Sequence, residues 1–249
     1  MRLLLRMEPL SLWEALRRFN DIMHIIDNFF TDPYRIRNIA LKSEYYCCNN
    51  YRWPGYRADI PTPIQNELEG KLSAVLGEEV SMREGSFQYS DKSWGTGVPH
   101  FDSPHYTCLT FLNLDAPPNS GIEVYDDRFK QEYAPPGYET VIGTPNGMNI
   151  HVFNKDKRNF YRNRKSLISK MIFRKKLKEY RKLFVDPCIA SNKFNRTVVF
   201  DSSRVHRAQD FFGTDVNNSR LTIISFFVKS NEYQPNFARR TYDGMFGSP

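Results

Sequence analysis

From about residue 80 onward, apolar and polar positions alternate with a period of two, which is the pattern of strands that bury one face. These segments are short, rich in Thr, Val, Ile, Phe and Tyr, and separated by clusters of Gly, Pro, Asn and Asp. The pattern predicts an antiparallel sandwich or barrel with helices packed outside it. The segments are SMREGSFQYS (81–90), YTCLTFLNL (106–114), GIEVY (121–125), RTVVFD (196–201), RVHRA (204–208) and RLTIISFFV (220–228).

Before residue 80 the apolar period is helical. Ser11 and Glu14 have the spacing of a capping box and open a predicted amphipathic helix that reaches Met23. HIIDNFF (24–30) follows as a predicted strand, and Asp32 before a proline marks the start of a second helix. A third helix is predicted between Thr62 and the stop signal Gly77.

A basic insert interrupts the series of strands. Residues 155–182 hold 13 Lys or Arg and two acids, whereas the rest of the chain carries a net charge of −4. The insert predicts a helix whose apolar residues line one side. Its charged face is either a solvated surface over a helix that covers the barrel, or a docking surface for nucleic acid or an acidic protein. The residues of the apolar side are Leu167, Ile168, Met171, Ile172, Leu177 and Tyr180.

We expect one domain over residues 1–249, mainly β with flanking helices. Residues 1–79 provide helices and an entry strand, 80–228 the barrel with its basic helical insert at 155–184, and 229–249 a tail. The composition, with 40% hydrophobic residues among 249, is that of a chain with a core. The sequence has no zinc-ribbon cysteine spacing, no signal-peptide pattern and no long apolar run, so we expect a cytoplasmic protein that does not enter a membrane.

The stretch VPHFDSPHYTCLTFLN (98–113) contains the candidate chemistry. In an extended segment His100 and Asp102 point the same way, with Cα atoms roughly 6.5 to 7 Å apart, so both side chains can bind one metal. His206, in a later strand, is the candidate third ligand. Two histidines and one carboxylate form the facial triad of non-haem Fe(II) oxygenases. His105 has odd spacing from His100 and is predicted to face away.

A His-x-acid pair alone arises often by chance, and an arginine strengthens the hypothesis. Arg220 comes 14 residues after His206 and opens an apolar strand. Its planar guanidinium is suited to binding a carboxylate in a partly dry pocket. Thr222 lies two residues further on and faces the same side, where its hydroxyl adds a donor.

These motifs, PHFD, YTCLTFLN, NSGIEVY, VVFDSSRVHRA and SRLTIISFF in that order, resemble the 2-oxoglutarate- and Fe(II)-dependent dioxygenases. The resemblance covers about residues 80–228 and is strongest to the prolyl-4-hydroxylase-like branch, in particular to an uncharacterised bacterial and phage family. HIIDNFFTDPYRIRNIAL (24–41) also resembles the entry strand and helix of these enzymes. The implied fold is a double-stranded β-helix, a jelly-roll or cupin-like barrel with the metal at its mouth.

Carried over by position, the resemblance implies that His100, Asp102 and His206 bind Fe(II) and that Arg220 binds the distal carboxylate of 2-oxoglutarate. Tyr89 stands where relatives often have a tyrosine that touches this cosubstrate. The sequence departs from the family at Phe111, where some prolyl hydroxylases use a tyrosine hydroxyl on the same carboxylate. Thr107 or Thr222 is the candidate replacement.

The implied reaction consumes dioxygen and 2-oxoglutarate, releases succinate and carbon dioxide, and hydroxylates a C–H bond of a peptide side chain or a small metabolite. Related halogenases replace the acid at the position of Asp102 with a small residue, so hydroxylation is favoured over halogenation. The alternative is a non-catalytic jelly-roll binding module that holds nucleic acid or an acidic protein through the basic insert. Nucleic acid is the less favoured partner, and neither the primary substrate nor the oligomeric state follows from the sequence.

Overall fold

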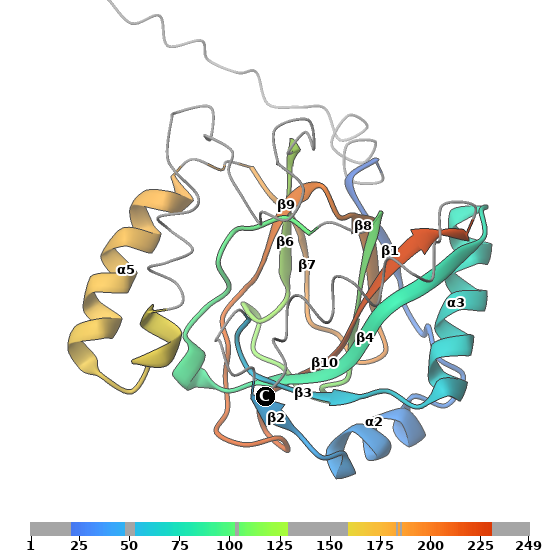
Figure 1. Cartoon of the computed structure of the whole chain (residues 1–249), viewed down its shortest axis with the longest axis horizontal. Coiled ribbons are helices and arrows are strands. Elements are labelled where there is room, and N and C mark those ends of the chain that lie inside the picture. The colour runs from blue at the N-terminus through green and yellow to red at the C-terminus, as the bar shows by residue number, and fades with distance from the viewer. Residues whose placement is uncertain are drawn as a thin grey trace, which may run out of the picture.

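The computed structural model describes residues 21–47, 53–102, 105–128, 159–182, 184 and 186–230. The predicted N-terminal helix falls almost entirely outside these residues, as does the tail after residue 230. The described chain forms two antiparallel sheets with three longer helices around them (Figure 1). None of the helices within the described ranges is long and apolar enough to cross a membrane.

The larger sheet contains seven strands, each antiparallel to its neighbours. The six segments with alternating polarity all form strands, four of them in this sheet. In spatial order its strands are β1 (His24–Ile26), β8 (Thr197–Asp201), β5 (Tyr106–Phe111), β10 (Arg220–Lys229), β4 (Val80–Ser90), β3 (Tyr56–Asp59) and β2 (Tyr46–Cys47).

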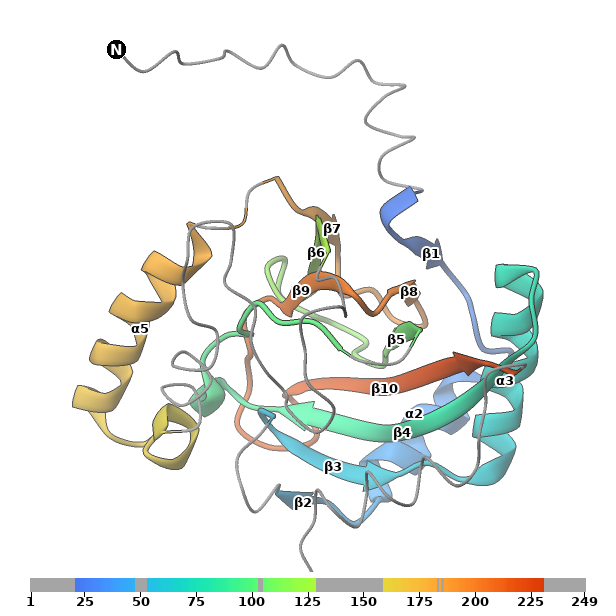
Figure 2. The ribbon, with the colours of Figure 1, turned by 45° about the horizontal axis from the view of Figure 1, so that its top comes forward.

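The smaller sheet has three strands, β7 (Cys188–Ala190), β6 (Ile122–Arg128) and β9 (Arg204–Ala208), in that order. Figure 2 shows it facing the larger sheet. Side chains from the two inner faces form one buried cluster, because alternate residues of each strand point inward. Its members include Leu109, Phe111, Val198 and Phe200 from the larger sheet and Ile122, Val124 and Ala190 from the smaller one.

Two predicted helices cover the outer face of the larger sheet. Helix α2 (Pro33–Lys42) begins where Asp32 accepts a hydrogen bond from the Arg35 amide, and α3 (Thr62–Leu76) ends at Gly77, whose φ of 68° favours glycine. Their apolar residues pack against the outward-facing residues of β4 and β10. The buried contacts include Ile36, Ala40, Leu68 and Leu72 on the helices and Phe87, Leu221 and Ile223 on the strands.

The basic insert contains helix α5 (Leu167–Arg181), at the left of Figure 1, but its predicted apolar side is wrong in part. Phe173 and Leu177 are buried against Trp94 and Tyr161. Phe173 lies about 200° around the helix from Met171, so the two residues cannot share a face. The helix therefore has two apolar faces, and the second is exposed at Leu167, Ile168, Met171 and Ile172.

These two faces differ in what they contribute to stability. We expect Phe173→Ala to reduce the free energy of unfolding by about 3 kcal/mol, because it leaves a cavity beneath α5. Met171→Ala, on the exposed face of the same helix, changes this free energy by less than about 0.5 kcal/mol. Urea unfolding of both variants measures the difference, and equal effects would contradict the packing of α5.

Candidate metal site

His100 and His206 are brought together by the backbone. The two residues form an antiparallel bridge, in which the His100 amide donates to the His206 carbonyl at 3.0 Å and the His206 amide donates back at 2.8 Å. His206 belongs to β9 and pairs directly with Val124 of β6. Directly paired residues share a face, and Val124 is buried between the two sheets, so His206 also points inward. The Asp102 amide donates to the Ser202 carbonyl at 2.9 Å, which fixes the third residue at the turn between β8 and β9.

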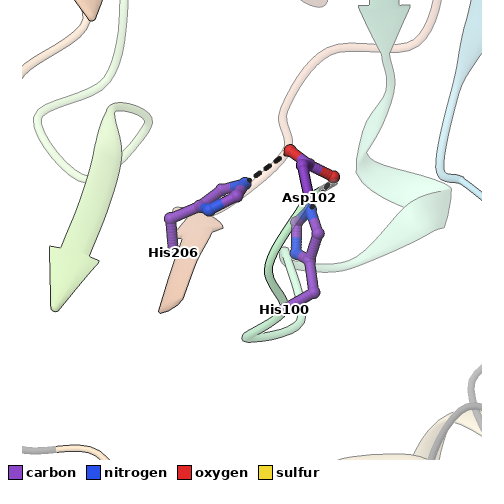
Figure 3. Close-up of side chains that lie close together, drawn as sticks. All are labelled: His100, Asp102 and His206. Atoms are coloured by element: carbon purple, nitrogen blue, oxygen red, sulfur yellow. Dashed lines mark ion pairs between the residues drawn. The ribbon is translucent and has the colours of Figure 1, made fainter. Parts of the chain in front are cut away.

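The three side chains converge, as Figure 3 shows. Nε2 of His206 lies 3.1 Å from Oδ2 of Asp102, and Nε2 of His100 lies 3.9 Å from Oδ1. All three residues offer ligand atoms within 4.8 Å of one another. Donors about 2.1 Å from one metal and at right angles to each other are roughly 3 Å apart, so small shifts bring this set to a single ion.

Hydrogen bonds orient both imidazole rings for this purpose. Nδ1 of His100 lies 2.7 Å from the Val98 carbonyl, and Nδ1 of His206 lies 2.9 Å from the Arg204 carbonyl. A carbonyl only accepts, so Nδ1 carries the proton in each ring and Nε2 is the ligand atom. Metal-binding histidines commonly donate their other nitrogen to such a group. The donor set and its orientation therefore fit a divalent transition metal.

Asp102 is held as a carboxylate. Burial acts to raise its pKa, but the adjacent His206 and His100 and the hydrogen bond from Thr107 outweigh burial and hold the pKa below its usual range. Thr107 Oγ1 lies 3.1 Å from Oδ2 of Asp102 and 2.8 Å from Oγ of Ser202. Thr107 was predicted as a candidate cosubstrate contact, and in the structure its hydroxyl donates to the Asp102 carboxylate.

This placement makes Thr107 a positioning residue with a measurable effect. We expect Thr107→Val to weaken metal binding by about 10- to 100-fold, because Asp102 loses the donor that fixes its orientation. Thr107→Ser keeps a hydroxyl and should retain most of the affinity. Equilibrium dialysis against Fe(II) or Ni(II) gives both values, and wild-type affinity in Thr107→Val would contradict this role.

Arg220 lies on the inner face of the larger sheet, with only 2% of its surface exposed. Its Nε donates to the Ser120 carbonyl at 2.9 Å, and its guanidinium lies 5.4 Å from the Phe111 ring centre. Burial lowers the pKa of Arg220 to about 10, so the side chain stays cationic at neutral pH. Among the residues that the structure describes, no carboxylate pairs with it. A buried cation without a counter-charge is costly, and this one is suited to an anionic ligand.

The other predicted cosubstrate contacts divide between the two faces of the sheet. Thr222 shares the face of Arg220, where its hydroxyl donates to the Gln88 carbonyl at 3.4 Å. Tyr89 pairs with Leu221 on the opposite face and stacks on Tyr56 with ring centres 4.8 Å apart. The structure therefore does not bring Tyr89 together with Arg220.

Ser90 is the residue on β4 that the sequence did not indicate. It pairs directly with Arg220, and directly paired residues share a face. Its hydroxyl is buried and has no hydrogen-bond partner within the described part of the chain. The sequence shows that alternate residues of β4 face the same side, but not whether the odd or the even residues face inward. The pairing of β4 with β10 shows that Ser90, and not Tyr89, lies on the face of Arg220.

Other polar residues near the motif serve different contacts. His105 is not part of the converging group, and its Nδ1 accepts a hydrogen bond from the Lys229 amide at 3.2 Å. Arg204 pairs with Asp126 at 2.7 Å, and Arg207 pairs with Glu123. These two arginines, which flank His206, are thus held within the fold.

The sequence matches one family model. The model of a family of unknown function (DUF6445) matches residues 13–134, a range that contains His100 and Asp102 but not His206. No curated protein is significantly similar in sequence.

Several solved structures are similar in fold. HygX from Streptomyces hygroscopicus aligns with a TM-score of 0.50 at 12% identity, over 89% of this chain and 88% of HygX. SnoK, a non-haem α-ketoglutarate-dependent carbocyclase from nogalamycin biosynthesis, aligns with a TM-score of 0.50 at 10% identity, over 93% and 91% of the two chains. A prolyl hydroxylase from Trichoplax adhaerens aligns with a TM-score of 0.46 at 12% identity, over 91% and 99%.

The chain therefore has the double-stranded β-helix fold of the 2-oxoglutarate- and Fe(II)-dependent oxygenases, as its motifs predicted. Within that fold it carries a His-Asp-His group whose donor set fits Fe(II).

Proposed function

We propose that the protein is an Fe(II)- and 2-oxoglutarate-dependent oxygenase that hydroxylates a peptide side chain or a small metabolite. The observation that carries this proposal is the convergence of His100, Asp102 and His206, with both Nε2 atoms turned toward the carboxylate. HygX, which is similar in fold, was solved with nickel and 2-oxoglutarate bound, and this supports the choice of cofactors.

The polar residues of the candidate site have separate roles in this proposal. His100, Asp102 and His206 hold Fe(II), and Arg220 binds the distal carboxylate of 2-oxoglutarate with hydroxyl donors from Ser90 and Thr222 beside it. When bound, iron and 2-oxoglutarate supply the activation of dioxygen that hydroxylates a C–H bond and releases succinate and carbon dioxide. Retention of the acid at Asp102 favours hydroxylation over halogenation.

The exposure of the ligands indicates how the substrate reaches the site. The His206 side chain is 5% exposed, whereas that of His100 is 44% exposed. The metal site is thus closed on the side of the smaller sheet and open beside His100. We infer that the substrate approaches past His100, while the buried face excludes water from the cosubstrate.

Anaerobic titration with Fe(II) and 2-oxoglutarate tests the proposal. Bidentate binding of the oxoacid to a facial-triad iron gives a weak charge-transfer band in the visible region. We expect this band in the wild-type protein and none in His206→Ala. If the wild-type protein gives neither the band nor metal-dependent thermal stabilisation, the oxygenase proposal is wrong.

The alternative function, a module that only binds a partner, depends on the positive surface of the basic insert. Residues 159–182 carry ten Lys or Arg against one Glu, and most of these side chains are exposed. Such a surface attracts nucleic acid in a strongly salt-dependent way. A module that only binds through α5 would give no reason for the buried Arg220 or for the convergent metal donors, so we favour the enzyme.

A further inference from the structure

A hollow of about 250 Å³ lies on the larger sheet, between β3 and β4 and the loop that carries Trp53. Asp59, Glu84 and Ser86 line it, with Arg57 and Trp53 beside them. None of these residues belongs to the metal site.

The hollow and the metal site share one face of the sheet. Glu84 pairs with Phe226, which pairs with Thr107, so the three side chains lie in one row across β4, β10 and β5. Thr107 in turn holds Asp102. Adjacent strands are about 4.8 Å apart, so Glu84 lies roughly 10 Å from Thr107 along this row. A small molecule of that length or an extended peptide segment of about three residues spans that distance.

The surface between them is partly exposed. Phe226 and Ile224, the inward-facing residues of β10 in this region, are only partly buried although they belong to a central strand. Ile224 pairs with Ser86, and Ser86 pairs with Asp59, so the next row leads into the hollow as well. An apolar strip thus connects the hollow to the metal ligands.

The charges of the hollow favour a cation. Arg57 pairs with Glu84 at 2.9 Å and lies 4.2 Å from the centre of the Trp53 ring, so its charge is already compensated. Asp59 takes part in none of the ion pairs within the described residues and leaves an additional negative charge. The walls of the hollow are therefore net acidic.

Ser86 supplies an independent observation. Only 4% of its surface is exposed, and its hydroxyl has no hydrogen-bond partner among the residues the structure describes. A buried hydroxyl normally finds a partner. Ser86 stands directly opposite Asp59 and two residues from Glu84, so the three side chains share one face of the sheet, and all three residues line the hollow.

We propose that this hollow binds a primary ammonium group of the substrate. An ammonium has three N–H donors and no acceptor, which matches the two carboxylates and the Ser86 hydroxyl. The inference rests on the proposed oxygenase function and specifies its substrate class: a lysine-containing peptide or an amine-bearing metabolite that reaches from the hollow to the metal ligands.

Binding of a matched pair of probes to the full chain tests this inference. Nα-acetyl-lysine amide and Nα-acetyl-norleucine amide differ in the terminal ammonium group, and saturation-transfer NMR ranks their affinities. We expect the lysine derivative to bind at least about tenfold more tightly, as a charge-assisted hydrogen bond provides. Asp59→Asn should remove this preference, and Ser86→Ala should reduce it. Asp115→Asn changes an exposed acid between β5 and β6 and should retain it.

The outcomes separate this inference from the proposed function. Equal binding of the two probes, or an unchanged lysine preference in Asp59→Asn, overturns the ammonium site. The Fe(II) and 2-oxoglutarate charge-transfer band is measured on the same preparations. If the band is present without a lysine preference, only the ammonium site is wrong. If the wild-type protein gives neither the band nor metal-dependent thermal stabilisation, the oxygenase proposal fails irrespective of probe binding. Thermal unfolding checks that Asp59→Asn and Ser86→Ala are folded.

Discussion

We expect Asp102→Ala to weaken Fe(II) binding by at least about 100-fold and to reduce succinate formation to background. The substitution removes the only anionic ligand of the converging group and leaves two neutral imidazoles. It also removes one of the two partners of the Thr107 hydroxyl, which still lies 2.8 Å from Oγ of Ser202. Affinity of a metal site depends on ligand number and charge, and a ligand deletion exceeds the 10- to 100-fold effect of outer contacts.

The measurement is metal content after dialysis together with the metal-induced shift in melting temperature. His105→Ala is the matched control, since this histidine is close in sequence but outside the converging group, and its variant should bind metal like wild type. Without metal, the stability of Asp102→Ala should differ from wild type by about 1 kcal/mol, because the residue lies outside the apolar core. Wild-type metal affinity in Asp102→Ala would rule out the assignment of this site.

The metal group was predictable because its geometry is mostly local. The spacing of His100 and Asp102 places both on one side of an extended segment, and a short strand around His206 supplies the third donor. The convergence itself requires the bridge between His100 and His206, which the sequence does not specify. The order of the motifs along the chain, which resembles that of the dioxygenases, was what indicated that His206 joins His100 and Asp102.

Register was the feature that sequence reasoning could not supply. A shift of one residue moves a side chain to the other face of a sheet. This separates Tyr89, which was predicted to contact the cosubstrate, from Ser90, which shares the face of Arg220. Thr107 was on the correct face, but its partner is Asp102, which precedes β5 in an irregular segment. The buried side of helix α5 was equally hard to predict. The helix has two apolar faces, and the sequence does not show which of them packs against the rest of the protein.

We expect Arg220→Met to raise the 2-oxoglutarate concentration needed for half-maximal turnover by more than about 100-fold. The buried guanidinium has no carboxylate partner within the described residues, so a carboxylate bound there gains a full charge pair. Breaking a buried charge pair costs about 3–5 kcal/mol, which corresponds to at least a 100-fold loss of affinity. Arg220→Lys should recover only part of it, because an ammonium cannot reproduce the planar two-point contact.

Fe(II) binding should be unaffected in Arg220→Met, since none of the metal donors contacts this side chain. The ligand-free stability should change by only about 1 kcal/mol. Removal of an uncompensated buried charge offsets the two hydrogen bonds lost at the carbonyls of Ser120 and Gly121. Thermal unfolding with Ni(II) at increasing 2-oxoglutarate therefore separates cosubstrate binding from folding. Wild-type stabilisation by 2-oxoglutarate in Arg220→Met would show that another residue binds the carboxylate, and Ser90→Ala would then be the next variant to measure.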